Sequence, residues 1–201
     1  MFDFDAMVDD VLMTSSTRPS RLRDRTRQTL LGAAIEVLGK HPGASMADIA
    51  AAAGVARSTL HRYFPDRSSL MDGIESHVEA EYEEALQHAR PHEGTGLAAY
   101  SRIVDELLER LDSLAWWMRT EYEEVADFDC EADRGIVAVV ARGQDDSSID
   151  TQFSAQWVVA MTWALLAEAH QQTGNEQLSR REIRDMCRNA LLKVAAGPSP
   201  Q

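Results

Sequence analysis

Residues 45–67, with the sequence SMADIAAAAGVARSTLHRYFPDR, constrain the fold of this chain more than any other stretch. Ser45 and Asp48 have the spacing of a capping box, in which each side chain accepts a hydrogen bond from the other residue's backbone N–H. A helix is therefore predicted to begin at Ser45. Gly54 supplies the positive φ at which a chain leaves one helix and begins another, so two short helices joined by a tight turn are expected. This is the outline of a helix-turn-helix.

The second of these helices is polar on its outer side. Val55, Leu60 and Phe64 can turn inward around the bend. The side chains left facing outward are those of Arg57, Ser58, His61, Arg62 and Tyr63. They span a segment short enough to enter the major groove of DNA.

Residues 54–70, GVARSTLHRYFPDRSSL, resemble the recognition helix and following turn of the TetR (tetracycline-repressor-like) family of transcriptional regulators. The Thr-Leu-x-x-Tyr-Phe core followed by Pro65 makes the resemblance specific. The remaining two thirds of the chain carry no matching motif. The resemblance itself implies this, because the ligand-binding domains of that family diverge widely.

The whole chain is predicted to be all-α. Gly and Pro are few, at 11 and 6 of 201 residues, and strand-like alternation is almost absent. Outside the helix-turn-helix, apolar residues at helical spacing predict helices that bring the total to about nine, over residues 26–39, 66–90, 97–111, 114–125, 129–142, 150–171 and 179–196. With the resemblance, this pattern divides the chain into a flexible arm (1–20), a helix-turn-helix DNA-binding domain (21–66) and a helical ligand-binding and dimerisation domain (67–201).

The distribution of charge favours DNA binding although the net charge is -13. Residues 18–67 hold nine Lys and Arg against four acids, whereas residues 68–201 hold eleven against 25. A cationic head on an anionic body would meet DNA in one orientation. Just before the first predicted helix, a basic arm could lie against phosphate or in the minor groove, or it could be a solvated linker; its arginines are Arg18, Arg21, Arg23 and Arg25.

Several function classes are not expected. Cys130 and Cys187 lie far apart without a CxxC pair, which fits neither zinc nor a disulfide framework and suits a reducing cytoplasm. No apolar run approaches the ~18 residues of a membrane span, and the acidic first residues do not resemble a secretory signal. The sequence shows no metal-spaced His pair, phosphate-binding Gly loop or nucleophile elbow. A soluble, cytoplasmic protein is expected, with no membrane partner, cofactor, metal or enzymatic activity.

The predicted DNA-binding residues lie in or beside the helix-turn-helix: Ser45, Arg57, Ser58, Thr59, His61, Arg62, Tyr63 and Arg67. Arg57 and Arg62 carry forked donors that match guanine O6 and N7, although either can bind phosphate instead. At its helix N-terminus, Ser45 can present N–H groups to a phosphate.

The resemblance implies further roles at this surface. It implies phosphate contacts for Thr59, Tyr63 and Arg67, which would fix register without reading sequence. The family commonly has an aromatic residue at the position of His61.

A small-molecule site is predicted outside the helix-turn-helix, where all four tryptophans lie. Its predicted residues are Trp116, Trp117, Glu121, Tyr122, Trp157, Met161, Trp163 and Glu168. Trp157, Met161 and Glu168 share one helix face with Ala164, and aromatic rings with carboxylates suit a flat or cationic ligand. The alternative is that these residues form the core, or that the small residues of 150–171 pack against a second subunit.

The resemblance also implies that helices 150–171 and 179–196 pair with their copies in a homodimer. A two-fold dimer would present two recognition helices about one DNA turn apart, which matches a palindrome. The predicted function is a TetR-like repressor that a small molecule, aromatic or cationic, releases from double-stranded operator DNA. The alternative is a small-molecule-binding or scaffolding helical protein without specific DNA recognition.

Overall fold

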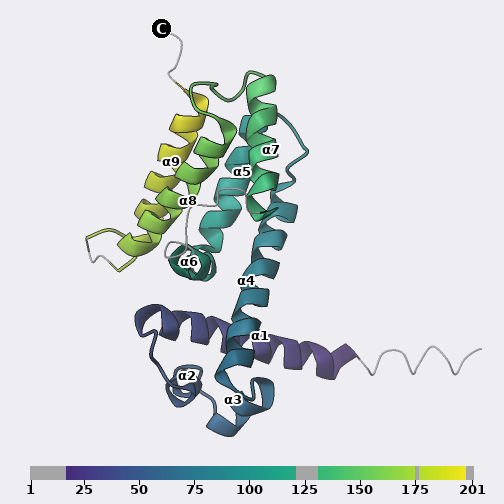
Figure 1. Ribbon diagram of the computed structural model, residues 1–201, viewed down its shortest axis with the longest axis vertical. Coiled ribbons are helices and arrows are strands. Elements are labelled where there is room, and N and C mark those ends of the chain that lie inside the picture. The colour runs from purple at the N-terminus through teal and green to yellow at the C-terminus, as the bar shows by residue number, and fades with distance from the viewer. Residues whose placement is uncertain (1–16, 121–130, 175–176, 198–201) are drawn as a thin grey trace, which may run out of the picture. The chain divides into compact units, whose positions relative to one another are not determined.

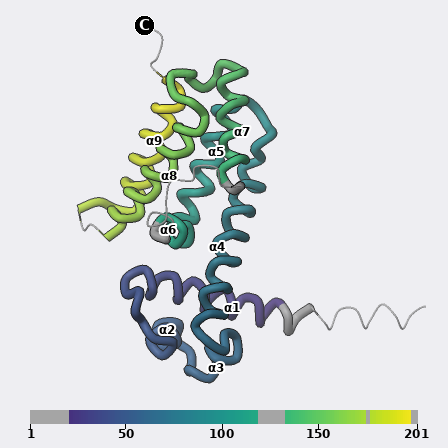
Figure 2. Tube along the Cα trace, in the orientation of Figure 1, coloured from purple at the N-terminus to yellow at the C-terminus, as the bar shows by residue number. Residues whose placement is uncertain are grey.

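The computed structural model describes residues 17–120, 131–174 and 177–197, and the regular secondary structure of these residues is entirely helical (Figures 1 and 2). The all-α prediction is therefore confirmed. The helices are α1 (Thr17–Lys40), α2 (Met46–Ala52), α3 (Arg57–Tyr63), α4 (Arg67–Ala89), α5 (Gly96–Glu109), α6 (Leu111–Thr120), α7 (Glu131–Asp145), α8 (Ala155–Gln172) and α9 (Arg180–Ala196).

The chain divides into two compact units, Met1–His77 and Val78–Gln201. The division falls inside α4, so that this helix contributes its first part to the N-terminal unit and its second part to the C-terminal unit. None of the described helices is both long enough and apolar enough to cross a membrane.

The predicted local signals of the N-terminal unit are present. The Ser45 hydroxyl accepts from the N–H of Asp48 at 3.3 Å, and the Ser45 N–H donates to Asp48 Oδ2 at 2.8 Å. Gly54 has the positive φ of 67° that the turn between α2 and α3 requires. Asp66 caps α4 by accepting from the N–H of Ser69 at 2.7 Å. These short-range hydrogen bonds fix where α2 and α4 begin, and the turn at Gly54 precedes α3.

The core of the N-terminal unit is the stripe predicted on α1 together with the inner faces of α2, α3 and α4. Its buried apolar side chains are Leu30, Leu31, Ala34, Ile35, Leu38, Ile49, Leu60, Phe64, Leu70 and Ile74. Removing these side chains from water holds α2, α3 and the first part of α4 against α1. The outer side of α3 is thereby left facing solvent.

Two predicted helix starts are wrong. α1 begins at Thr17 rather than at the predicted Thr26. The Thr26 hydroxyl donates to the carbonyl oxygen of Leu22 at 2.9 Å, and the Thr29 hydroxyl donates to that of Arg25 at 3.0 Å. Both threonines therefore lie inside the helix. Arg21, Arg23 and Arg25 therefore lie on a helix and not in an arm that precedes it.

The second wrong prediction is the start of α8, which begins at Ala155 rather than at Asp150. The Asp150 carboxylate accepts from the N–H of Gln152 at 2.6 Å, and this turn competes with the helix. The actual cap is Ser154, which accepts from the N–H of Trp157 at 3.2 Å.

In the C-terminal unit, α5, α7, α8 and α9 form a ring of contacts in which each helix packs against two others. α5 and α7 approach most closely at Gly96, where an added Cβ would lie 2.1 Å from Cα of Gly143. Inside this bundle the hydroxyls of Tyr100 and Thr162 are hydrogen-bonded at 2.8 Å. Burial raises the pKa of Tyr100 to about 12, so its phenol stays protonated.

α9 is fixed by a row of arginines that the sequence analysis did not single out. Arg180 and Arg188 donate to Asp112 and Asp105 at 2.7 and 2.6 Å, and Arg184 pairs with Glu109 between them. The buried stripe of α9 consists of Ile183, Cys187, Leu191 and Ala195. Ala190 and Val194, on the neighbouring side of the helix, are half-buried.

Candidate functional site

The outer side of α3 is open to solvent. Arg57, Ser58 and Arg62 are exposed, and Thr59 and Tyr63 are half-exposed. In the described part of the chain no hydrogen bond or ion pair engages the guanidinium groups of Arg57 and Arg62. These predicted groove-facing residues are therefore brought together on one surface, with the guanidinium donors of Arg57 and Arg62 available.

Ser45 is arranged differently from the rest of this set. Its hydroxyl donates to Asp48 Oδ2 at 2.7 Å, and its backbone N–H donates to the same oxygen. These hydrogen bonds hold the pKa of Asp48 below its usual value of 3.8. A carboxylate thus occupies the position where a phosphate was predicted to meet the N–H of Ser45.

Arg67 is engaged within the protein. Its guanidinium donates to the carbonyl oxygens of Ala44 and Pro42 at 2.5 and 2.7 Å. These two carbonyls belong to the loop between α1 and α2, so the side chain ties that loop to the start of α4. The structure gives Arg67 a structural contact besides the phosphate contact that the family resemblance implies.

His61 is fixed by the turn that follows α3. Its Nδ1 lies 2.9 Å from the carbonyl oxygen of Pro65. Because a carbonyl oxygen can only accept, Nδ1 carries the hydrogen, and Nε2 of the neutral ring is an acceptor. The tautomer is thus set by the fold.

The C-terminal unit holds a cluster of three aromatic rings from three helices. The ring of Tyr82 meets that of Trp117 edge-on at 5.6 Å and that of Trp163 at 6.0 Å. The indole N–H of Trp163 donates to Oδ1 of Asp133 at 2.7 Å. Tyr82 is 3 % exposed, while the two indoles are half-buried. We call Tyr82, Trp117, Trp163 and Asp133 the aromatic cluster.

The structure separates the predicted ligand residues. Of the predicted ligand residues that the structure describes, Trp117 and Trp163 join the aromatic cluster, whereas Trp116 is a core residue at 6 % exposure. Trp157 is 55 % exposed on α8. Side chains six residues apart on an α-helix lie on different sides of it, so Trp157 and Trp163 point in different directions.

Met161 and Glu168 lie on α8 outside the aromatic cluster. Met161 is half-buried, and Glu168 is exposed and accepts from Gln172 at 2.7 Å. The face of α8 predicted to line a pocket therefore faces outward. Glu121 and Tyr122 lie outside the described residues.

Two residues of the aromatic cluster were missed in the sequence. Tyr82 lies four residues after Val78, on the apolar stripe predicted for α4, so its helical spacing could have identified it. Asp133 is one acid among many and carries no comparable signal. Its proximity to Trp163 depends on how α7 packs against α8.

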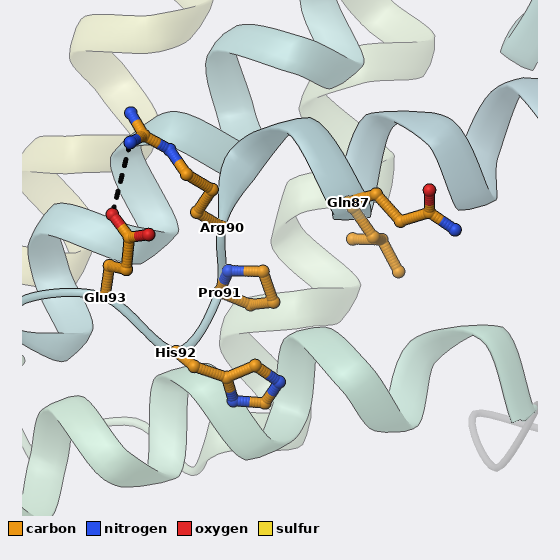
Figure 3. Close-up of a pocket in the computed structure, with 6 residues that line it drawn as sticks. Gln87, Arg90, Pro91, His92 and Glu93 are labelled. Atoms are coloured by element: carbon orange, nitrogen blue, oxygen red, sulfur yellow. Dashed lines mark ion pairs between the residues drawn. The ribbon is translucent and has the colours of Figure 1, made fainter.

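A separate hollow of about 420 Å³ lies at the end of α4 and in the following loop (Figure 3). It is lined by Leu86, Gln87, Arg90, Pro91, His92 and Glu93. Arg90 and Glu93 pair with each other at 3.2 Å across one side of it. It contains none of the predicted ligand residues.

Groups that would hold a metal are not clustered in the described ranges: no three His, Cys, Asp or Glu side chains come together there. Burial raises the pKa of the Cys187 thiol to about 11, which keeps it protonated and unreactive.

Comparison with known proteins identifies the family. Residues 30–74 match the sequence model of "Bacterial regulatory proteins, tetR family". The HTH-type transcriptional repressor LfrR of Mycolicibacterium smegmatis is 34% identical over 184 residues, which cover 89% of this chain and 95% of that repressor.

Crystal structures show the same relationship. LfrR from Mycobacterium smegmatis in complex with proflavine has a TM-score of 0.63 at 32% identity, over 88% of this chain and 99% of that one. A second crystal structure of LfrR has a TM-score of 0.64 at 31% identity, over 86% and 97% of the two chains. With the helix-turn-helix in place and a relative of this identity over nearly the full length, the chain belongs to the TetR family of bacterial regulatory proteins, which are DNA-binding transcriptional regulators and not enzymes.

Proposed function

We propose that this regulator is a homodimeric repressor that a planar aromatic cation releases from a palindromic operator. The N-terminal unit binds the operator, and the chain from Val78 onward binds the ligand and forms the dimer. Since its partner is DNA, the protein acts in the cytoplasm.

DNA binding is supported by the surface of α3. The unpaired guanidinium of Arg57 suits a guanine edge in the major groove, with Ser58 beside it. Thr59 and Tyr63 offer hydroxyls to the phosphates. The nine basic groups of residues 18–67 supply the electrostatic attraction.

Dimerisation through α8 and α9 is supported by the apolar residues that these helices leave exposed. Trp157 on α8 is 55 % exposed and Met186 on α9 is 60 % exposed. Large aromatic and thioether side chains are typical of the centre of a protein interface. A second copy of the chain would remove both from water.

The ligand class is supported above all by the aromatic cluster. Two indoles and a phenol pack together beside the carboxylate of Asp133, and this combination of rings and carboxylate suits cation–π attraction joined to an opposite charge. The relative LfrR has been crystallised with proflavine, a ligand of this class.

The experiment is to select DNA fragments from the source genome on the purified protein and then titrate proflavine into the complex. We expect a palindromic fragment whose affinity falls steeply with salt, and its release by proflavine. Retention of the fragment at saturating proflavine would overturn the ligand class. Failure to prefer any fragment over random DNA would overturn the repressor function.

A further inference from the structure

Arginines from two different helices lie at the ring of Tyr63. Cζ of Arg62, on α3, is 5.6 Å from the ring centroid, and Cζ of Arg23, on α1, is 6.0 Å from it. Both distances are within the range of cation–π attraction. Arg23 and Arg62, which are 39 positions apart in the sequence, thus place two positive charges around one phenol.

We propose that Arg23, Arg62 and Tyr63 form one binding site for a phosphate of the DNA backbone, and that α1 thereby contributes directly to operator affinity. The proposal rests on the proposed DNA binding and adds a contact from outside the helix-turn-helix. We call these three residues the phosphate triad.

The polar groups of the phosphate triad have no other use in the fold. Arg23 and Arg62 are exposed, and within the described ranges neither they nor the Tyr63 hydroxyl make a hydrogen bond or an ion pair. Two like charges at one ring repel each other, and an anion between them would remove that cost. The site therefore lacks only a negatively charged partner.

Arg27, one turn after Arg23 on α1, has a structural role in the N-terminal unit. Its guanidinium lies over the ring of Phe64 at 5.3 Å, and its Nη2 would be 3.2 Å from a Cβ added to Gly73. Phe64 is a buried core residue, so Arg27 covers the core. Arg23, one turn earlier, has the half-exposed Tyr63 in place of a core residue.

The first half of α1 carries more positive charge than its folding requires. Residues 17–28 contain five arginines and one acid, and the first buried side chain in the described part of α1 is that of Leu30. The helix also has no acid in its first turn, where a negative charge would favour the helix dipole. A basic, solvent-exposed helical extension beside the recognition helix has the charge that fits a polyanion.

The chemistry favours a phosphate over a base. Two guanidinium forks lie around one ring that carries a hydroxyl. Charge-assisted hydrogen bonds from such donors suit phosphate oxygens. The cation–π contacts hold the arginine side chains near the ring before DNA arrives. Such a contact fixes register and adds affinity to every DNA sequence alike.

The test compares Arg23→Ala with Arg25→Ala, which removes the same charge two residues along α1 on another side of the helix. Binding to the selected operator and to random DNA is measured over a range of salt. For Arg23→Ala we expect both affinities to fall about fivefold in 0.15 M salt, with the slope of log K against log salt reduced in magnitude by about 0.9. Arg25→Ala should lose clearly less, and thermal melting should show both variants folded.

A double variant completes the test. Arg23→Ala combined with Arg62→Ala should lose less than the sum of the two single losses on a free-energy scale, because both act on one phosphate. Equal losses for Arg23→Ala and Arg25→Ala, an unchanged salt slope, or strict additivity would overturn the phosphate triad while leaving the repressor function intact. Absence of DNA binding by the unaltered protein would instead overturn the repressor function.

Discussion

Trp163 donates its indole N–H to Oδ1 of Asp133 across 2.7 Å, so that α8 and α7 hold an aromatic ring and a carboxylate side by side. The same indole contacts Tyr82, whose ring also meets Trp117. A flat cation placed here would meet ring faces and an opposite charge together.

Asp133→Asn should weaken proflavine binding about tenfold, equal to about 1.4 kcal/mol, because the amide keeps a hydrogen-bond acceptor for Trp163 but loses the charge. Quenching of tryptophan fluorescence measures the affinity. A neutral aromatic ligand of the same ring size should bind both proteins alike. Glu168→Gln is the matched control, since Glu168 is exposed on the outer face of α8. Equal proflavine affinity for Asp133→Asn and the unaltered protein would refute the role of Asp133.

Trp157→Arg should convert the dimer to monomers. An exposed indole at the centre of an interface contributes about 2 kcal/mol or more, so the dimer dissociation constant should rise at least about 30-fold. Sedimentation equilibrium measures this constant. Leu22→Arg is the control, because Leu22 is 69 % exposed but lies on α1. If Trp157→Arg dimerises as tightly as Leu22→Arg, the interface lies elsewhere.

Arg67→Ala should destabilise the N-terminal unit by about 1 kcal/mol, since two charge-assisted hydrogen bonds to the carbonyls of Pro42 and Ala44 are lost at an exposed site. Urea unfolding gives the free-energy change. Arg57→Ala removes the same charge from a side chain without such contacts and should leave stability unchanged. A loss of DNA affinity in Arg67→Ala without any loss of stability would show that Arg67 acts mainly on phosphate.

Asp146→Asn should flatten the dependence of stability on acid pH. Hydrogen bonds from the Ser148 side chain and from the Gly96 N–H hold the pKa of the Asp146 carboxyl below its usual value of 3.8. A lowered folded-state pKa stabilises the protein above the unfolded value, and this stabilisation is lost as pH falls through the folded value. The melting temperature of the unaltered protein should therefore fall more steeply between about pH 5 and pH 3 than that of Asp146→Asn. Asp145→Asn, at the exposed neighbouring residue, should follow the unaltered protein; the same flattening in both variants would contradict the assignment.

Elements set by contacts within four residues were predictable from the sequence. The capping box at Ser45 and the turn at Gly54 occur as predicted, and Ser179 and Asp66 cap α9 and α4 in the same local way. Each of these signals acts through backbone hydrogen bonds of its own turn, so no information from distant residues is needed. The same locality explains why the family resemblance could be identified from residues 54–70 alone.

The extent of α1 was harder to predict because its first part has no apolar stripe. Arg21, Leu22 and Arg23 are exposed, so hydrophobic spacing does not reveal that they are helical. That extension brings Arg23 to Tyr63, a contact between residues that the sequence keeps far apart.

The sequence by itself determined the all-α class, the helix-turn-helix and the residues that its second helix presents to solvent, because caps, glycine turns and 3.6-residue periodicity are local properties of the chain. Only the tertiary structure decided that Trp163 joins Tyr82 and Asp133 while Trp157 stays exposed on the same helix. Which side of a helix becomes an interior depends on where its neighbours cross it, and that is fixed by the packing of all the helices together.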